Sequence, residues 1–157
     1  MISNIPTVKP ISTILLAEDN LTHCFFFKKA LHQVAPEIKC NDVHDGDGLM
    51  TLLQNFIPDL LFLDLDMPCK NGVECIKEIR ENKAYDVLPI VVFTISAQEN
   101  AIQTAYGFGA NLYFVKPSDL SQLVGSLQKI LLMDWSDTAA ITEKHFRNNK
   151  YMAFEAV

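Results

Sequence analysis

Five short apolar runs alternate along the chain with longer segments in which apolar residues recur every three or four positions. The runs cover residues 13–17, 38–43, 60–63, 88–93 and 112–115. Each is too short for an independent helix; the run at 38–43 alternates only weakly, and the others suit strands buried on both faces of a parallel sheet. The longer segments begin near residues 20, 46, 73, 98 and 118 and have the spacing of amphipathic helices.

This alternation predicts the α/β fold class. Strands that are separated by helical crossovers form a parallel sheet with right-handed connections and helices on both faces. We therefore expect a doubly wound five-stranded parallel sheet with five flanking helices. In the first helix, which Asn20 can cap, Phe25 and Phe26 lie beside the apolar stripe. Either a broad buried face absorbs these two rings, or they form an exposed apolar patch for docking.

The 157 residues fit one domain. Residues 1–11 contain Pro6 and Pro10 and are expected to form a flexible lead-in, and residues 12–133 hold the predicted sheet with its helices. Residues 134–157 have no strong amphipathic period and carry scattered aromatic side chains. We expect them either to pack on the body as a helical or frayed extension, or to serve as an arm for dimerisation or partner binding.

Composition narrows the class of partner. The chain is 49% hydrophobic and 20% charged, as in globular proteins, and its net charge of −6 gives no electrostatic footprint for nucleic acid or an anionic membrane surface. No apolar run is long enough to span a membrane, and the first ten residues lack the pattern of a secretory signal, so we expect a cytoplasmic location. The four cysteines form no C-x-x-C pair and are interpreted as reduced packing residues.

Four of the five predicted strands end in a chemically useful group. Glu18 and Asp19 follow the first strand, and the central strand ends at Asp64. Asp66 comes two residues later, the fourth strand ends at Thr94, and the fifth ends at Lys116. Each alone has an ordinary explanation, such as a cap, a turn or a surface lysine. In a parallel sheet, however, these ends share one edge, where open α/β sheets place their ligand sites.

Clustered carboxylates raise one another's pKa unless a cation lies among them, and Mg²⁺ is a natural occupant because it prefers oxygen ligands and keeps several waters. A divalent cation, a lysine and a hydroxyl donor are what phosphoryl transfer requires, since that chemistry depends on positioning and on charge neutralisation. A carboxylate can act as the nucleophile and form an aspartyl-phosphate. Asp64, at the centre of the sheet, is the candidate.

These motifs resemble the receiver domains of two-component response regulators. The resemblance covers about residues 12–133 and rests on Glu18-Asp19, on Asp64-Leu-Asp-Met-Pro68 with Gly72, on Thr94, and on Tyr113-Phe-Val-Lys-Pro117. It implies a flavodoxin-like sheet with strand order 2-1-3-4-5. Residues 88–94, residues 105–111 and Trp135 are most similar to small single-domain regulators associated with phytochrome-type histidine kinases.

The resemblance implies a role for each residue of the site. Asp64 would accept a phosphoryl group from a kinase phosphohistidine. Asp19, Asp64 and the backbone carbonyl of Asp66 would bind Mg²⁺, and Glu18 would assist through water. Lys116 would pair with the phosphoryl oxygens.

The resemblance also implies a switch. Thr94 would donate its hydroxyl to the phosphoryl group, and its movement would let Tyr113 turn inward and repack the surface of the fourth helix, fifth strand and fifth helix. Such a change is a two-state element biased by local charge. The bond between Lys116 and Pro117 is expected to be cis, as in similar receivers.

Two positions depart from the family pattern. Ile95 follows the switch threonine where such receivers usually have a small residue, so it is a candidate for limiting access to the site. Asp66 adds a carboxylate at a position associated in the family with phosphoryl lifetime, and its charge should disfavour a phosphoprotein without metal.

Three other functions can be compared with the sequence. The pair Asp64 and Asp66 resembles the nucleophile and acid of haloacid-dehalogenase-type phosphatases, although Glu18 and Asp19 precede it here and there is no room for a cap domain. A flavodoxin would need a hydroxyl-rich phosphate loop that is missing. The stronger rival is a pseudo-receiver, an interaction module that keeps the fold without phosphorylation.

The favoured interpretation is a single-domain response regulator that catalyses only its own phosphorylation and dephosphorylation. Its expected partners are a sensor histidine kinase, of the phytochrome-associated type by resemblance, or a phosphotransfer protein, together with a downstream protein target. A homodimer is a further candidate assembly. Neither a nucleic acid nor a membrane is an expected partner.

Overall fold

The computed structural model describes residues 9–156, and the expected lead-in over residues 1–11 falls largely outside them. The strands of the main sheet are β1 (Thr13–Ala17), β2 (Lys39–Val43), β3 (Leu60–Leu63), β4 (Ile90–Thr94) and β5 (Leu112–Val115). The helices are α1 (Leu21–Val34), α2 (Gly46–Leu53), α3 (Gly72–Glu81), α4 (Glu99–Phe108), α5 (Leu120–Leu131) and α6 (Thr138–Lys144), with one 3₁₀ turn at Lys83–Tyr85.

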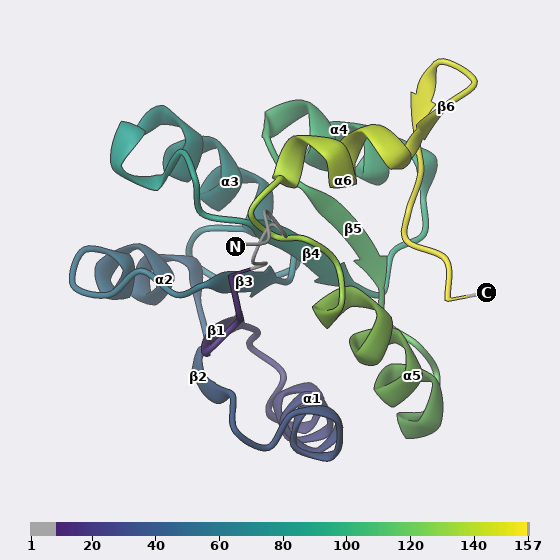
Figure 1. Ribbon diagram of the computed structural model, residues 1–157. Helices are drawn as coiled ribbons and strands as arrows, with labels where there is room; N and C mark the ends of the chain where they lie inside the picture. The colour runs from purple at the N-terminus through teal and green to yellow at the C-terminus, as the bar shows by residue number, and fades with distance from the viewer. Residues whose placement is uncertain (1–8, 157) are drawn as a thin grey trace, which may run out of the picture.

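The main sheet is parallel throughout and has the order β2-β1-β3-β4-β5. The predicted flavodoxin-like fold is therefore confirmed. Helices α1 and α5 cover one face of the sheet, and α2, α3 and α4 cover the other (Figure 1). The expectation of five helices was one short, because α6 lies in the C-terminal extension.

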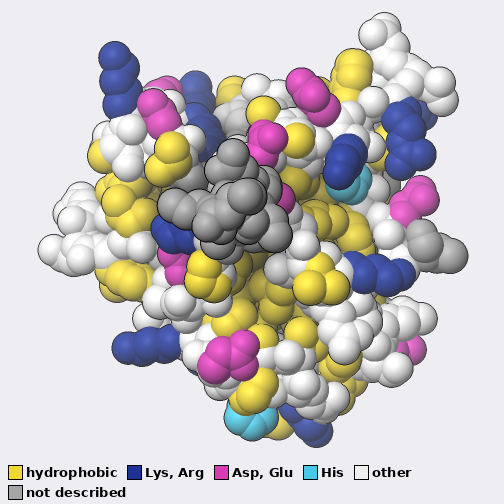
Figure 2. Space-filling view, in the orientation of Figure 1, with side chains coloured by type: hydrophobic (Ala, Val, Ile, Leu, Met, Phe, Trp, Pro, Cys, Tyr) yellow, Lys and Arg dark blue, Asp and Glu magenta, His cyan; other side chains and the backbone are white. Residues whose placement is uncertain are grey.

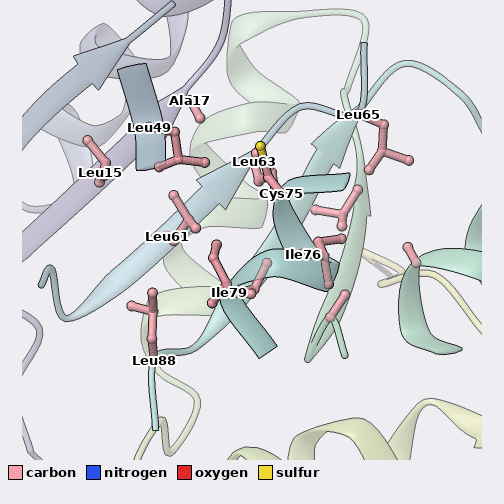
Figure 3. Packing of buried hydrophobic residues seen from close by; sticks show 14 of the residues in the cluster. Leu15, Ala17, Leu49, Leu61, Leu63, Leu65, Cys75, Ile76, Ile79 and Leu88 are labelled. Carbon is pink, nitrogen blue, oxygen red and sulfur yellow. The ribbon is translucent and has the colours of Figure 1, made fainter. Parts of the chain in front are cut away.

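The central strand β3 joins the two halves of the core. Successive side chains of a strand point to opposite faces, so Leu61 and Leu63 pack with α2 and α3 (Figure 3), whereas Phe62 packs against Phe27 of α1 at 4.9 Å between ring centroids. All four residues of β3 are fully buried. Burial of each such side chain contributes about 1.5–3 kcal/mol, which holds the strand, and the acid that follows it, firmly in place.

Local capping sets where the helices begin. The side chain of Asn20 accepts a hydrogen bond from the backbone N–H of His23 at the start of α1, as its position predicted. The side chain of Asp119 accepts a hydrogen bond from the backbone N–H of Gln122 at the start of α5. That helix therefore begins at Leu120 rather than near Ser118. These caps place the first turns of α1 and α5 beside the carboxyl edge of the sheet.

The C-terminal extension folds back onto the body. After α6, strands β6 (Phe146–Arg147) and β7 (Lys150–Tyr151) form an antiparallel hairpin. Residues 150–156, here called the C-terminal strap, then run beside β5 between α4 and α5 (Figure 1). The backbone N–H of Phe154 donates to the carbonyl of Tyr113 at 2.7 Å. The extension therefore lies along the β5 edge of the main sheet.

Two further features of the described chain bear on the predictions. No helix within residues 9–156 is both long and apolar enough to cross a membrane. On the face drawn in Figure 2, acidic and basic side chains are interspersed and no large basic patch is visible.

The bond between Lys116 and Pro117 is trans, so the expectation of a cis bond was wrong for this structure. The trans form of an X–Pro bond is intrinsically favoured by about 0.5–1 kcal/mol, and the Lys116 ammonium reaches Asp64, at 3.0 Å, with the bond in that form.

Candidate functional site

The predicted strand ends meet at the carboxyl edge of the sheet. Asp64 follows the central strand β3, and its backbone N–H donates to the carbonyl of Ala17 at the end of β1. As a result, one carboxylate oxygen each from Glu18, Asp19 and Asp64 lie within 4.8 Å of one another. The parallel sheet thus brings together acids that are 45 residues apart in the chain.

Lys116, from the end of β5, crosses into this acidic cluster. Its ammonium donates to Asp64 Oδ2 at 3.0 Å and to Glu18 Oε1. It also lies 2.9 Å from His23 Nδ1, which must accept because an ammonium only donates. The lysine side chain is only 7% exposed, so these charge-assisted contacts are largely shielded from solvent.

His23 was not among the residues predicted from the sequence. It lies in the first turn of α1 and lines the site together with Lys116. Its pKa is lowered by burial and then by the charge of Lys116, which keeps the imidazole neutral beside the ammonium. No local motif marks this histidine, since only its place after the cap Asn20 brings it to the edge of the sheet.

The pKa values of Glu18 and Asp64 are shifted in opposite directions. Burial raises the pKa of Glu18 to about 7, although the hydrogen bond from Lys116 acts against this rise. Burial would also raise the pKa of Asp64, but its hydrogen bonds with Glu18, the backbone of Asp66 and Lys116 lower it overall. Asp64 therefore carries the negative charge at neutral pH, as a nucleophilic carboxylate must.

The turn after β3 presents the Asp64 carboxylate. The backbone N–H of Asp66 donates to Asp64 Oδ1 at 3.1 Å, and the N–H of Gly72 donates to the carbonyl of Leu65 at 3.0 Å. A Cβ at Gly72 would lie 2.4 Å from the carbonyl oxygen of Asp64, so only glycine permits α3 to begin this close to the acceptor. Asp66 points its own side chain to solvent, and the use of its carbonyl as a metal ligand stays a prediction.

Thr94 and Tyr113 are both buried beside the site. The hydroxyl oxygen of Thr94 is fully enclosed and has no hydrogen-bond partner among residues 9–156. Tyr113 already lies inward, with its hydroxyl donating to the carbonyl of Ser96 at 2.7 Å. A buried hydroxyl without a partner is costly, and an acceptor that arrives at the site would satisfy it.

A pocket of about 450 Å³ opens beside the acidic cluster, between the first turns of α1 and α5. Its lining includes His23, Phe26, Ile95 and Lys116. Ile95 is 67% exposed and lies at this approach to the site. Phe26 and its neighbour Phe25 are also exposed, so the sheet-facing side of α1 does not absorb them.

The side chains fit a hard divalent cation. Three carboxylates with convergent oxygens match the ligand preference of Mg²⁺, which completes its shell with waters and needs few protein ligands. A cation there would also offset the cost of burying the charged form of Glu18 beside Asp64.

A flavodoxin-like sheet that gathers carboxylates, a buried hydroxyl and an ammonium at its carboxyl edge defines a receiver-type signalling domain. The chain belongs to the response regulator receiver domain family, which residues 14–128 match. This family is a signalling domain of two-component systems and not a conventional enzyme.

Similar proteins agree with this assignment. Response regulator Rcp1 of Synechocystis sp. is 29% identical over 139 residues, which cover 84% of this chain and 94% of Rcp1. The transcriptional regulatory protein PdtaR of Mycobacterium tuberculosis is 30% identical over 115 residues, and the match covers 73% of this chain and only 54% of PdtaR.

Two solved structures have the same fold. The phosphorylated cyanobacterial phytochrome response regulator RcpA has a TM-score of 0.71 and 31% identity, with 76% of this chain and 91% of RcpA covered. The Mn²⁺-bound form of Rcp1 has a TM-score of 0.69 and 29% identity over the same shares of the two chains. The Rcp1 structure thus holds a divalent metal ion, and the RcpA structure carries a phosphoryl group.

Proposed function

We propose that this chain is a phosphorylated switch in which Asp64 accepts a phosphoryl group from a phosphohistidine. The observation that carries the proposal is the arrangement of Lys116 on Asp64 Oδ2, at 3.0 Å, beside the buried and unpartnered hydroxyl of Thr94. Both groups are donors that a phosphoryl group on Asp64 would engage. Without that group, the Thr94 hydroxyl has no described partner.

In the transfer, an Asp64 oxygen attacks phosphorus, the N–P bond of the donor breaks, and the histidine nitrogen leaves with its electron pair and takes a proton. Asp19 and Asp64, with Glu18 through water and the carbonyl of Asp66, would hold Mg²⁺. When bound, the cation offsets the negative charge of the phosphoryl oxygens. Lys116 would leave Glu18 and pair with a phosphoryl oxygen.

The surface at which a phosphodonor protein would bind is inferred from the pocket and from exposed apolar side chains beside it. Phe26 on α1 and Ile95, just after β4, form an apolar rim of the pocket beside Asp64, and the exposed ring of Phe25 packs against Phe26 at 5.7 Å between centroids. We assign this rim to a histidine kinase or phosphotransfer protein in the cytoplasm. The likeness to RcpA favours a kinase of the phytochrome type.

The surface for a downstream protein is inferred from the C-terminal extension. The described part of this extension belongs to the receiver body in this proposal. The N–H of Phe154 donates to the carbonyl of Tyr113, and the carbonyl of Met152 accepts from the Tyr106 hydroxyl, which in turn accepts from the N–H of Tyr113. A shift of the β5 backbone at Tyr113 would therefore be felt by the strap, and a downstream protein would meet a surface that includes the strap.

The first experiment is incubation of the pure chain with Mg²⁺ and acetyl phosphate, followed by intact mass measurement. One added phosphoryl group that is absent in Asp64→Asn supports the switch. Asp86→Asn is the matched control, because it removes an exposed carboxylate before β4, at the opposite end of that strand from the site, and it should be labelled like the unmodified chain. Equal labelling of Asp64→Asn would refute the assignment of the acceptor.

If the unmodified chain is not labelled, either Ile95 blocks the donor or the chain is a pseudo-receiver, and Ile95→Ala separates these two explanations. Labelling of that variant alone means that Ile95 limits access of the donor. Absence of labelling in both, together with absence of Mg²⁺ binding, would favour the pseudo-receiver.

A further inference from the structure

A second group of metal-ligating side chains lies on the other side of α1. Cys24, Asp42 and His44 each offer one ligand atom, and the three atoms lie within 4.8 Å of one another. They are a thiol, a carboxylate and an imidazole, whereas the side-chain ligands grouped at Asp64 are all carboxylates. This group takes no part in the proposed phosphoryl transfer.

The fold explains why these residues meet. Asp42 lies on β2, the edge strand of the sheet, and His44 follows two positions later and therefore points to the same side. Cys24 lies on the inner side of α1 and is buried, and its Sγ donates to the carbonyl of Glu18 at 3.5 Å. Helix α1 and the end of β2 thus present their ligands to one another.

We propose that Cys24 Sγ, Asp42 Oδ2 and His44 Nε2 form a binding site for one divalent transition-metal ion of the Zn²⁺ type. A thiolate and an imidazole are the ligands that such ions prefer, and Mg²⁺ does not. Three protein ligands leave the fourth tetrahedral position for water. The inference does not depend on the proposed phosphorylation.

The neighbours of Asp42 support a site of this kind. Lys28, one turn after Cys24 on α1, pairs with Asp42 Oδ1 and so orients the carboxylate, leaving Oδ2 toward His44. Partners of this type, which hold a ligand from behind, are usual around bound metals.

An entry path exists on the side of His44. Its side chain is 51% exposed, and its Nε2 lies 2.5 Å from Asp42 Oδ2. Because the imidazole is on the surface, it can rotate outward and let an ion insert between the two atoms at about 2.0–2.2 Å from each. The buried Cys24 thiol would supply the third protein ligand from the side of α1.

The test is titration of the metal-free chain with Co²⁺, with a phosphine reductant and excess Mg²⁺ present to occupy the acidic site. A thiolate-to-cobalt charge-transfer band in the near ultraviolet reports on cysteine ligation. We expect the band to saturate at one Co²⁺ per chain and to disappear when Zn²⁺ is added. His44→Ala, which changes an exposed residue, and Cys24→Ser should each weaken binding at least about tenfold.

Matched variants separate this site from other sources of the band. His32→Ala removes an exposed histidine from α1, Cys69→Ser removes an exposed thiol, and Asp64→Asn alters the acidic site; none should change the band. Absence of the band in the unmodified chain would overturn the proposal. So would loss of the band in Cys69→Ser or Asp64→Asn while His44→Ala retains it.

Discussion

The hydroxyl of Tyr106 on α4 accepts a hydrogen bond at 3.0 Å from the backbone N–H of Tyr113 on β5. The same hydroxyl donates at 2.9 Å to the carbonyl of Met152 in the C-terminal strap. The ring of Tyr106 stacks on Tyr151 with 4.7 Å between centroids. One buried side chain therefore connects the strand of the proposed switch to the strap that covers it.

Tyr106→Phe should lower the free energy of unfolding by about 1–3 kcal/mol, because it leaves a buried N–H and a carbonyl without their partner. Urea denaturation measures this change. Tyr151→Phe is the control, since it keeps the stacked ring, and its hydroxyl makes no hydrogen bond within residues 9–156. An equal effect of the two variants would contradict the role of the Tyr106 hydroxyl.

Gly72→Ala and Gly125→Ala should change stability in opposite directions. The Cβ at Gly72 would lie 2.4 Å from the Asp64 carbonyl oxygen and force α3 away from the acceptor turn. At Gly125, inside α5, a Cβ meets no described atom within 4 Å, so alanine should stabilise the helix by about 0.5–1 kcal/mol. Thermal unfolding of the two variants, compared at one pH, tests this expectation; destabilisation by Gly125→Ala would contradict it.

Thr94→Val should not destabilise the chain, although Thr94 is fully buried. The hydroxyl has no partner to lose, and its removal relieves an unsatisfied group, so we expect a gain of about 1 kcal/mol. The same variant should show weakened labelling by acetyl phosphate. Thr142→Val is the comparison, because Thr142 Oγ1 donates to the carbonyl of Asn111 at 2.9 Å, and its loss should destabilise by about 1 kcal/mol. A loss of stability in Thr94→Val would show that its hydroxyl has a partner.

Asp59 should give the chain a pH-dependent stability below pH 4. Burial acts to raise the pKa of Asp59, but hydrogen bonds from the backbone N–H groups of Ser12, at 2.8 Å, and Thr13, at 3.0 Å, lower it below the ordinary 3.8. A group with a lowered folded pKa stabilises the fold above its unfolded pKa, and this stabilisation is lost as the pH falls through the folded pKa.

Asp59→Asn should therefore be less stable by about 1 kcal/mol at pH 7, and the difference should vanish in acid, where both side chains are neutral. Urea denaturation across pH 2–7 measures the difference. Glu37→Gln, an exposed change, is the control and should stay within about 0.5 kcal/mol at each pH. A difference for Asp59→Asn that is constant with pH would contradict this account.

The sequence by itself determined the sheet and the site on its edge. Continuous apolar runs such as β3 must be buried on both faces of the sheet. Because parallel strands place their carboxyl ends on one edge, the order of strands and helices in the sequence was enough to predict that Asp64 and Lys116 lie close together. The cap at Asn20 was also predictable, because capping depends on neighbours within one turn.

Only the tertiary structure decided the contacts between distant segments. The strap depends on contacts of Phe154 and Met152 with β5 and α4. The hairpin that leads into it turns at Asn148 and Asn149, both with positive φ, for which the sequence analysis made no prediction.

The group formed by Cys24, Asp42 and His44 also depends on contacts between distant segments. Cys24, interpreted from spacing as a packing residue, meets Asp42 and His44 only because α1 packs beside the end of the edge strand β2, where Lys28 pairs with Asp42. Periodicity reports which way a side chain faces within its own element, whereas the partner that it meets is set by how the elements pack, and no local pattern contains that information.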